Sequence, residues 1–132
     1  MDIETLQLPR VMDAERFSDL DYFVRHTVFI ICHKSEPVDT LQAILRYLPA
    51  DSPRIVVTNC PEREFAQLND ELGKQLTTRG ATYLVHQKDD RVAHFFRECG
   101  VSHILDASGS VADGKGEGMY IGTILAALLD TA

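Results

Sequence analysis

What the chain lacks excludes several classes of protein. No apolar run approaches the roughly 20 residues that a membrane-spanning helix requires, and the start, Met1–Glu4, lacks the basic region and apolar stretch of a secretory signal. A basic excess is also missing: the formal net charge is −7 at pH 7, so we expect no sequence-independent binding to nucleic acid, which depends on neutralising phosphates. No internal repeat, low-complexity tract or linker interrupts the sequence.

Cysteine is scarce and forms no recognisable pattern. The three cysteines, Cys32, Cys60 and Cys99, are an odd number without close spacing, which favours reduced thiols and a cytoplasmic protein. Cys32 adjoins His33, but one cysteine and one histidine without further ligands make a weak metal site. Adjacent strand residues point to opposite faces, which also disfavours a catalytic Cys–His pair. We therefore predict no metal site from these residues.

Length and composition predict one globular domain. The 132 residues suffice for a substantial core, and the hydrophobic (45%) and charged (25%) contents are ordinary for such a domain. Residues 1–26 form an N-terminal extension, in which apolar spacing predicts a short helix over Asp13–Arg25. Residues 27–132 form the main domain.

Within this main domain, short apolar runs alternate with segments whose apolar residues recur at helical spacing. The continuous run Val28–Cys32 indicates a strand buried on both faces. Val101–Leu105 is either a fourth short strand or an extended loop, and 106–114 is a loop. The other expected strands are 54–58 and 81–86, and the expected helices are 37–48, 61–80, 92–99 and 119–129.

This order of elements predicts an α/β fold, with a three-layer, Rossmann-like parallel sheet and right-handed crossovers. In such sheets ligands bind beyond the carboxyl ends of the strands. The candidate site therefore comprises the segments that follow the strands and the loop before the last helix: 33–36, 59–61, 87–90 and 114–118.

The most informative of these segments is Gly114–Met119, with the sequence GKGEGM. Glycines let a backbone approach a ligand closely, a helix N-terminus presents free N–H groups, and Lys115 supplies a charge suited to phosphate. The segment matches neither the Walker A motif nor the dinucleotide-binding fingerprint. Two interpretations stay open: a diphosphate contact, or a flexible surface loop that starts a helix and has Glu117 as its cap.

The other strand ends carry polar residues that also have two interpretations. Lys34 and Glu36 are either ligand contacts or a solvated turn in which Glu36 stabilises the next helix. Gln87 can exchange hydrogen bonds with a base edge and Lys88 can meet phosphate; alternatively both belong to a polar loop in which Asp89 caps a helix. We assign the remaining residues of this kind to the surface: His94, His103, Asp106 and Asp113.

Four segments together resemble the mannosyl-3-phosphoglycerate synthase family in order and spacing. They are Lys34–Glu36 after the first apolar strand, Val56–Asn59, His86–Asp89 and Gly114–Met119. The resemblance extends from about Thr27 to Ala127, and the last two segments are the more specific. It implies a GT-A fold and a retaining glycosyltransferase that moves mannose from GDP-mannose to 3-phosphoglycerate with a divalent metal such as Mg²⁺, in mannosylglycerate synthesis.

The resemblance also implies roles for individual residues. The family's first loop, of the type Pro-Val-Lys-Asn-Glu, aligns with Cys32–Glu36 and retains its lysine and glutamate, so that Glu36 would contact the ribose or the base. Asn59 would lie beside the nucleotide, and Lys115 with its neighbouring glycines would contact the diphosphate or the sugar. The full set of nucleotide-binding residues that it implies is Lys34, Glu36, Asn59, Gln87, Lys88, Gly114, Lys115, Gly116 and Glu117.

Two departures from the family bear on activity. Cys32 and Ser35 replace the proline and asparagine of the first loop. Family members are considerably longer, with a metal-binding Asp-x-Asp motif on the strand after the helix that here ends at Leu129, and an acceptor site beyond it. We therefore expect little or no transferase activity from this polypeptide alone, since those aspartates hold the metal that neutralises the leaving GDP.

Three hypotheses about the chain follow. In the first, it is part of an enzyme completed by a complementary C-terminal polypeptide, which predicts an exposed sheet edge and self-association into a homo-oligomer. In the second, it is a catalytically inactive, truncated homologue that acts as a nucleotide-binding or protein-interaction module. In the third, it is an interaction protein that retains the fold without the ligand.

Overall fold

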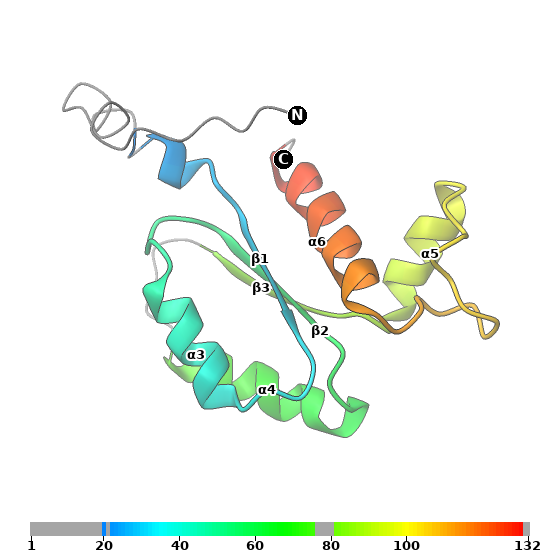
Figure 1. The fold of residues 1–132 in the computed structure, drawn as a ribbon, viewed down its shortest axis with the longest axis horizontal. Coiled ribbons are helices and arrows are strands. Elements are labelled where there is room, and N and C mark those ends of the chain that lie inside the picture. The colour runs from blue at the N-terminus through cyan, green and yellow to red at the C-terminus, as the bar shows by residue number, and fades with distance from the viewer. Residues whose placement is uncertain (1–19, 21, 76–80, 131–132) are drawn as a thin grey trace, which may run out of the picture.

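The structure, a computed structural model, describes residues 20, 22–75 and 81–130. In chain order its elements are β1 (Phe29–His33), α3 (Val38–Tyr47), β2 (Arg54–Thr58), α4 (Glu62–Gln75), β3 (Thr82–His86), α5 (Asp90–Glu98) and α6 (Lys115–Asp130). Strands and helices alternate from β1 to α5, and a further helix, α6, follows α5 (Figure 1).

The predicted helix near the N-terminus lies only partly within the described residues. Residues 22–25 are helical, whereas 13–19 and 21 lie outside the description. The expected closure of the 61–80 helix by Gly80 also lies outside it. Across the described parts of the chain, no helix has both the length and the apolar content needed to span a bilayer.

The three strands form one parallel sheet in the order β1-β2-β3, which confirms the predicted α/β fold. Val56 in β2 stands opposite Ile31 on one side and Leu84 on the other. All five residues of β2 are buried, whereas β1 is mostly half-buried. The expectation that β1 is buried on both faces was therefore wrong, because β1 borders the described sheet and β2 occupies its centre.

Helices cover both faces of the sheet and make it the middle of three layers (Figure 1). Because alternate strand residues point to opposite faces, Val56 packs with α3 and α4, and Ile55 and Val57 pack on the side of α5 and α6. The first core cluster contains Leu41, Leu45, Val56, Cys60, Leu68 and Leu72. The second contains Ile55, Val57, Phe96, Ile104, Val111 and Ile121.

A buried arginine connects the end of α3 to the start of β2. Arg54 is 0% exposed, and its guanidinium donates hydrogen bonds to the carbonyl oxygens of Leu45 at 2.8 Å, Pro49 at 2.7 Å and Ser52 at 3.2 Å. Burial lowers the pKa of Arg54 from its ordinary value. These bonds join a carbonyl in the last turn of α3 to two carbonyls of the loop that leads into β2.

The start of the last helix differs from expectation. Helix α6 begins at Lys115, four residues before the expected start at Met119, so the glycine-rich segment forms the first helical turn rather than a loop. An acidic residue in that turn, Glu117, favours helix formation there and offsets the poor helix propensity of glycine. Of the two alternatives for Val101–Leu105, the structure shows a loop, in which Leu105 forms an isolated antiparallel bridge with Val111.

Two glycines bring α6 close to the sheet. A Cβ atom added at Gly118 would lie 3.1 Å from Gln87 Oε1 and 3.3 Å from Cys32 Sγ. A Cβ atom at Gly122 would lie 2.3 Å from Ile30 Cγ2. Only a residue without a side chain lets the helix and strand β1 pack at this distance.

Replacing Gly122 with alanine tests this close contact. We expect Gly122→Ala to lower the free energy of unfolding by about 1–3 kcal/mol, because either α6 or Ile30 must move to accept the methyl group. The matched control is Gly73→Ala in α4, where no atom lies within 4 Å of the added Cβ and alanine should stabilise the helix by about 0.5–1 kcal/mol. Urea unfolding of the two variants measures both effects, and equal midpoints would contradict the prediction.

Candidate functional site

Two adjoining hollows lie beyond the carboxyl ends of the strands. The smaller cleft, of about 280 Å³, lies between the end of β1 and the start of α6. The larger groove, of about 1140 Å³, extends past the ends of β2 and β3 toward α4 and α5. Both are lined in part by Lys34, Asn59 and Asp113, so the hollows meet at these residues. This is where open α/β sheets bind ligands.

The smaller cleft brings together most of the residues that the sequence predicted as a site. The predicted residues that line it are Lys34, Glu36, Asn59, Gln87, Gly114 and Lys115. Lys88 lines the larger groove instead. Gly116 and Glu117 line neither hollow, although both belong to the first turn of α6.

The loop after β1 is held by a buried histidine. His33 Nε2 lies 2.8 Å from the carbonyl oxygen of Glu36, and Nδ1 lies 2.8 Å from Thr58 Oγ1. A carbonyl oxygen can only accept, so Nε2 carries the proton. Cys32 faces α6, where its Sγ lies 3.9 Å from the carbonyl oxygen of Lys115 and burial raises the pKa of the thiol. The two side chains therefore contact different partners, as expected for adjacent strand residues.

The Glu36 carboxylate is oriented by its own loop. Its Oε2 accepts a hydrogen bond from the backbone N–H of Lys34 at 2.8 Å, and backbone hydrogen bonds of this kind lower the pKa of Glu36. The carboxylate thus caps its own loop, immediately before the N-cap Pro37 of α3. By contrast, Asp89 Oδ1 accepts from the backbone N–H of Arg91 at 2.8 Å, which confirms the predicted cap of α5.

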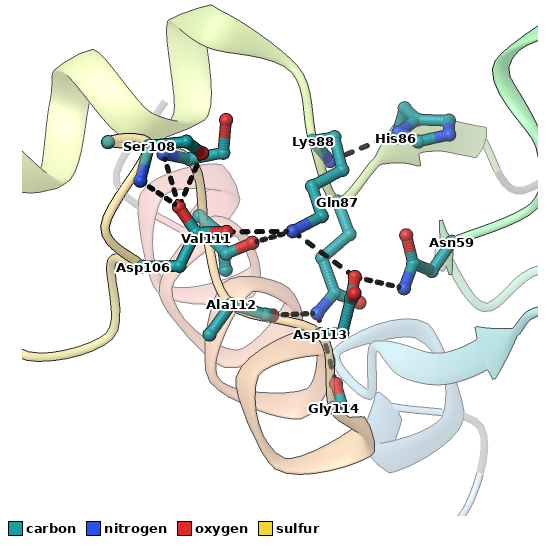
Figure 2. A network of polar contacts seen from close by, with 12 residues as sticks. Asn59, His86, Gln87, Lys88, Asp106, Ser108, Val111, Ala112, Asp113 and Gly114 are labelled. Atoms are coloured by element: carbon teal, nitrogen blue, oxygen red, sulfur yellow. Dashed lines mark hydrogen bonds and ion pairs between the residues drawn. The ribbon is translucent and has the colours of Figure 1, made fainter.

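Lys88 lies at the centre of a polar network (Figure 2). Its Nζ lies 2.6 Å from the carbonyl oxygen of Val111, 3.3 Å from Asp106 Oδ2 and 3.1 Å from Asp113 Oδ1. Partial burial disfavours the charged form, but Asp113 and Asp106 outweigh this and raise the pKa of Lys88. The ammonium is therefore charged and is bound to the segment that precedes α6.

Gln87 also binds the segment that precedes α6. It is 3% exposed, and its Nε2 donates hydrogen bonds to the carbonyl oxygens of Ala112 at 2.8 Å and Gly114 at 3.0 Å (Figure 2). The two residues that follow β3, Gln87 and Lys88, thus both bind the segment that precedes α6. The amide N–H groups of Gln87 are used within the protein.

Asp106 organises a tight turn with one carboxylate oxygen and binds Lys88 with the other. Oδ1 accepts from the backbone N–H of Ser108 at 2.9 Å, from its hydroxyl at 2.5 Å and from the backbone N–H of Ser110 at 3.2 Å. Gly109 adopts a φ of +83° in this turn, a conformation that suits glycine. The hydrogen bond from the Ser108 hydroxyl is the foremost cause that lowers the pKa of Asp106 to about 2.

Asp106 and Asp113 are exposed, as expected, but both have partners that the spacing in the sequence did not reveal. Asp113 Oδ1 accepts from Asn59 Nδ2 at 3.0 Å as well as from Lys88. The order Asp106-x-Ser108-Gly109 is a recognisable turn signal, but nothing in the spacing connects it to a lysine 18 residues earlier. His94 and His103 are exposed, as expected.

The first turn of α6 forms one wall of the smaller cleft. Gly114 precedes the helix, and its missing side chain leaves room for Glu117, whose Oε2 would lie 2.1 Å from a Cβ atom there. A glutamate at this position, reaching back over the residue before the helix, is typical of helix capping. Lys115 is exposed and lines the cleft. A positive helix end and an ammonium therefore lie beside each other.

The low pKa of Asp106 predicts how the contribution of this residue to the stability of the fold depends on pH. A carboxylate with a lowered pKa contributes stability above its ordinary pKa of 3.8, and this contribution is lost as the pH falls toward about 2. We expect Asp106→Asn to lower the urea midpoint at neutral pH, because asparagine loses the charge that faces Lys88. The difference from the wild-type protein should shrink between about pH 4 and pH 2. A difference that stays constant on acidification would contradict this assignment.

Comparison with known proteins agrees with the sequence resemblance. A family model described as mannosyl-3-phosphoglycerate synthase matches residues 5–132. The chain is 33% identical over 101 residues to mannosyl-3-phosphoglycerate synthase of Pyrococcus furiosus, covering 74% of this chain and 26% of that protein. It is 32% identical over 107 residues to the Aeropyrum pernix protein of the same name, covering 78% and 28%. The chain spans about a quarter of the length of these relatives, and it belongs to the mannosyl-3-phosphoglycerate synthase family.

Proposed function

We propose that residues 27–132 form the nucleotide-sugar-binding part of a GT-A mannosyltransferase that uses GDP-mannose as donor and 3-phosphoglycerate as acceptor. The observation that carries the proposal is the smaller cleft, which gathers six of the predicted nucleotide contacts at the carboxyl ends of parallel strands. For these residues the proposal covers donor binding. Mannose transfer is proposed only for a protein that also contains the parts of the relatives that this chain does not span.

The diphosphate of the donor is assigned to the wall made by α6. Lys115 and the N-terminal N–H groups of α6 attract anionic oxygens, and Lys34 lines the same cleft from the loop after β1. Two ammonium groups on separate elements suit two linked phosphates better than a single charge would. This arrangement favours a nucleoside diphosphate group over an uncharged sugar.

The nucleoside is assigned to the side of Glu36. The carboxylate lines the cleft, and its lowered pKa keeps it ionised at neutral pH. An ionised carboxylate accepts hydrogen bonds from ribose hydroxyls or from the N–H groups of guanine. Because the backbone N–H of Lys34 fixes one of its oxygens, the acceptor is already oriented before a ligand arrives.

The described residues do not fit the divalent metal that the family resemblance implies. The carboxylates of Asp106 and Asp113 already share the ammonium of Lys88. In the described part of the chain, no group of three or more histidine, cysteine or acidic residues is arranged to hold a metal ion. The proposal therefore derives no step through a metal at these residues.

Thermal unfolding in the presence of nucleotides tests the proposal. At a concentration of about 100 times its Kd, a ligand that binds only the folded state stabilises it by about 2.7 kcal/mol, which raises the midpoint by several degrees. We expect GDP and GDP-mannose to produce this shift, with or without Mg²⁺, and UDP and ADP to produce a smaller one. Lys115→Ala should weaken GDP binding roughly tenfold through loss of one charged contact.

Lys74→Ala is the matched control, because Lys74 is an exposed lysine of α4 that pairs with Asp70 away from the cleft. It should leave the nucleotide shifts unchanged. If millimolar GDP and GDP-mannose shift neither the wild-type protein nor the control, the donor site proposed here is wrong. That outcome would favour a chain that retains the fold without the ligand.

A further inference from the structure

The charged and amide donors at the end of β3 are matched by acceptors within the protein. An ammonium has three N–H donors, and Lys88 Nζ has three acceptors within 3.3 Å: Val111 O, Asp106 Oδ2 and Asp113 Oδ1. A primary amide has two N–H donors, and Gln87 Nε2 has two carbonyl acceptors. Both side chains therefore act on the segment before α6, although the sequence predicted that they contact the nucleotide.

Asp106 stands one step further from the cleft. It lines neither the smaller cleft nor the larger groove, although Ser108 and Ser110 of its turn line the groove. Its Oδ2 meets the Lys88 ammonium (Figure 2). Its Oδ1 closes the turn by accepting from the backbone N–H groups of Ser108 and Ser110. Any effect of Asp106 on a ligand must therefore pass through other residues.

A short chain of contacts connects Asp106 to the wall of the cleft. Lys88 binds the carbonyl oxygen of Val111, whose side chain is 0% exposed in the core beneath α6. Asp113 follows and shares the same ammonium, and Gln87 binds the carbonyl oxygens on both sides of it. Lys115 is the next residue after these anchored positions and begins α6.

We propose that Asp106 is a positioning residue for the nucleotide cleft: it orients the Lys88 ammonium, and Lys88 in turn holds residues 111–114 so that Lys115 and the N-terminus of α6 face the ligand. The inference rests on the proposed function, because it concerns the same cleft. It assigns Lys88 to the placement of a phosphate-binding helix end and not to direct contact with phosphate.

The direction in which Asp106→Asn changes the affinity for GDP distinguishes a positioning role of Lys88 from direct contact of Lys88 with phosphate. Asp106→Asn keeps the shape and the oxygen that accepts from Ser108 and Ser110 but removes the charge that faces Lys88. If Lys88 contacts phosphate directly, this substitution frees its ammonium and removes a nearby negative charge, so GDP should bind more tightly. If Asp106 positions the cleft, GDP should bind more weakly, by about fivefold or more.

Isothermal titration calorimetry of the folded wild-type and Asp106→Asn proteins with GDP and with guanosine measures the change in each Kd. We expect the Kd for GDP to rise and the Kd for guanosine to change less, because the displaced helix end serves the phosphates. Global destabilisation alone would not separate the two ligands at a temperature at which both proteins are folded. A Kd for GDP that is unchanged or lower in Asp106→Asn would overturn the proposal.

Two further variants keep the test decisive. Asp70→Asn, which removes an exposed carboxylate from an ion pair on α4, should leave both Kd values unchanged and controls for the loss of one negative charge. Ser108→Ala removes the hydroxyl that binds Asp106 Oδ1 and leaves every charge in place, so it replaces Asp106→Asn if the latter does not fold; it should also weaken GDP binding. Wild-type protein that binds no nucleotide refutes the proposed function itself, and the inference about Asp106 fails with it.

Discussion

The close contact between α6 and the sheet is the constraint on which the candidate site depends. Gly118 lies where a side chain would press against Gln87 Oε1 and Cys32 Sγ, and Gly122 lies against Ile30. If α6 stood further from β1 and β2, the amide of Gln87 would no longer reach the carbonyl oxygens of Ala112 and Gly114. The glycines therefore determine where the helix begins as well as how it packs.

This packing also explains why a glycine-rich segment forms a helix. Glycine lowers helix propensity by about 1 kcal/mol relative to alanine, and three glycines lie within the first eight residues of α6. The apolar residues that follow bury Ile121 and half-bury Ile124 and Leu125 against the sheet. Tertiary contacts thus outweigh local preference. The result is a helix end that forms one wall of the smaller cleft through Gly114 and Lys115.

The distribution of positive charge follows from the same arrangement. Lys88 and Lys115 both lie near the start of α6, yet Lys88 meets two carboxylates and a carbonyl, whereas Lys115 lines the smaller cleft. A chain with a net charge of −7 can nevertheless present a local anion site, because fields of exposed charges fall off within about 10 Å at ordinary ionic strength. Lys88 therefore holds the segment before α6 in place, and Lys115 is available to a ligand.

The sequence predicted the elements better than the contacts between loops. Strand 54–58 was predicted with its observed ends, because a short apolar run between turn residues determines a buried strand locally. The ends of the parallel strands then located the cleft, since parallel strands place their carboxyl ends together. The partners of Asp106 and Asp113 could not be predicted, because they come from Lys88 and Asn59 on other elements and no periodic rule spans such distances. The start of α6 was missed because the glycines of its first turn have poor helix propensity, and the packing of the helix on the sheet is not visible in the sequence.

Asp113 shows how the two hollows are related physically. Its carboxylate accepts from Asn59, which follows β2, and from Lys88, which follows β3, and it lines both hollows. Without that carboxylate, the Asn59 amide and the Lys88 ammonium would have unpaired donors where the cleft meets the groove. With it, these donors are paired and Asp113 places a negative charge there. The hydrogen bond from Asn59 and the ion pair with Lys88 lower the pKa of Asp113, so this anion persists at neutral pH. In the proposed donor site, this negative charge disfavours a diphosphate beside Asp113 and favours its placement beside Lys115, on the wall formed by α6.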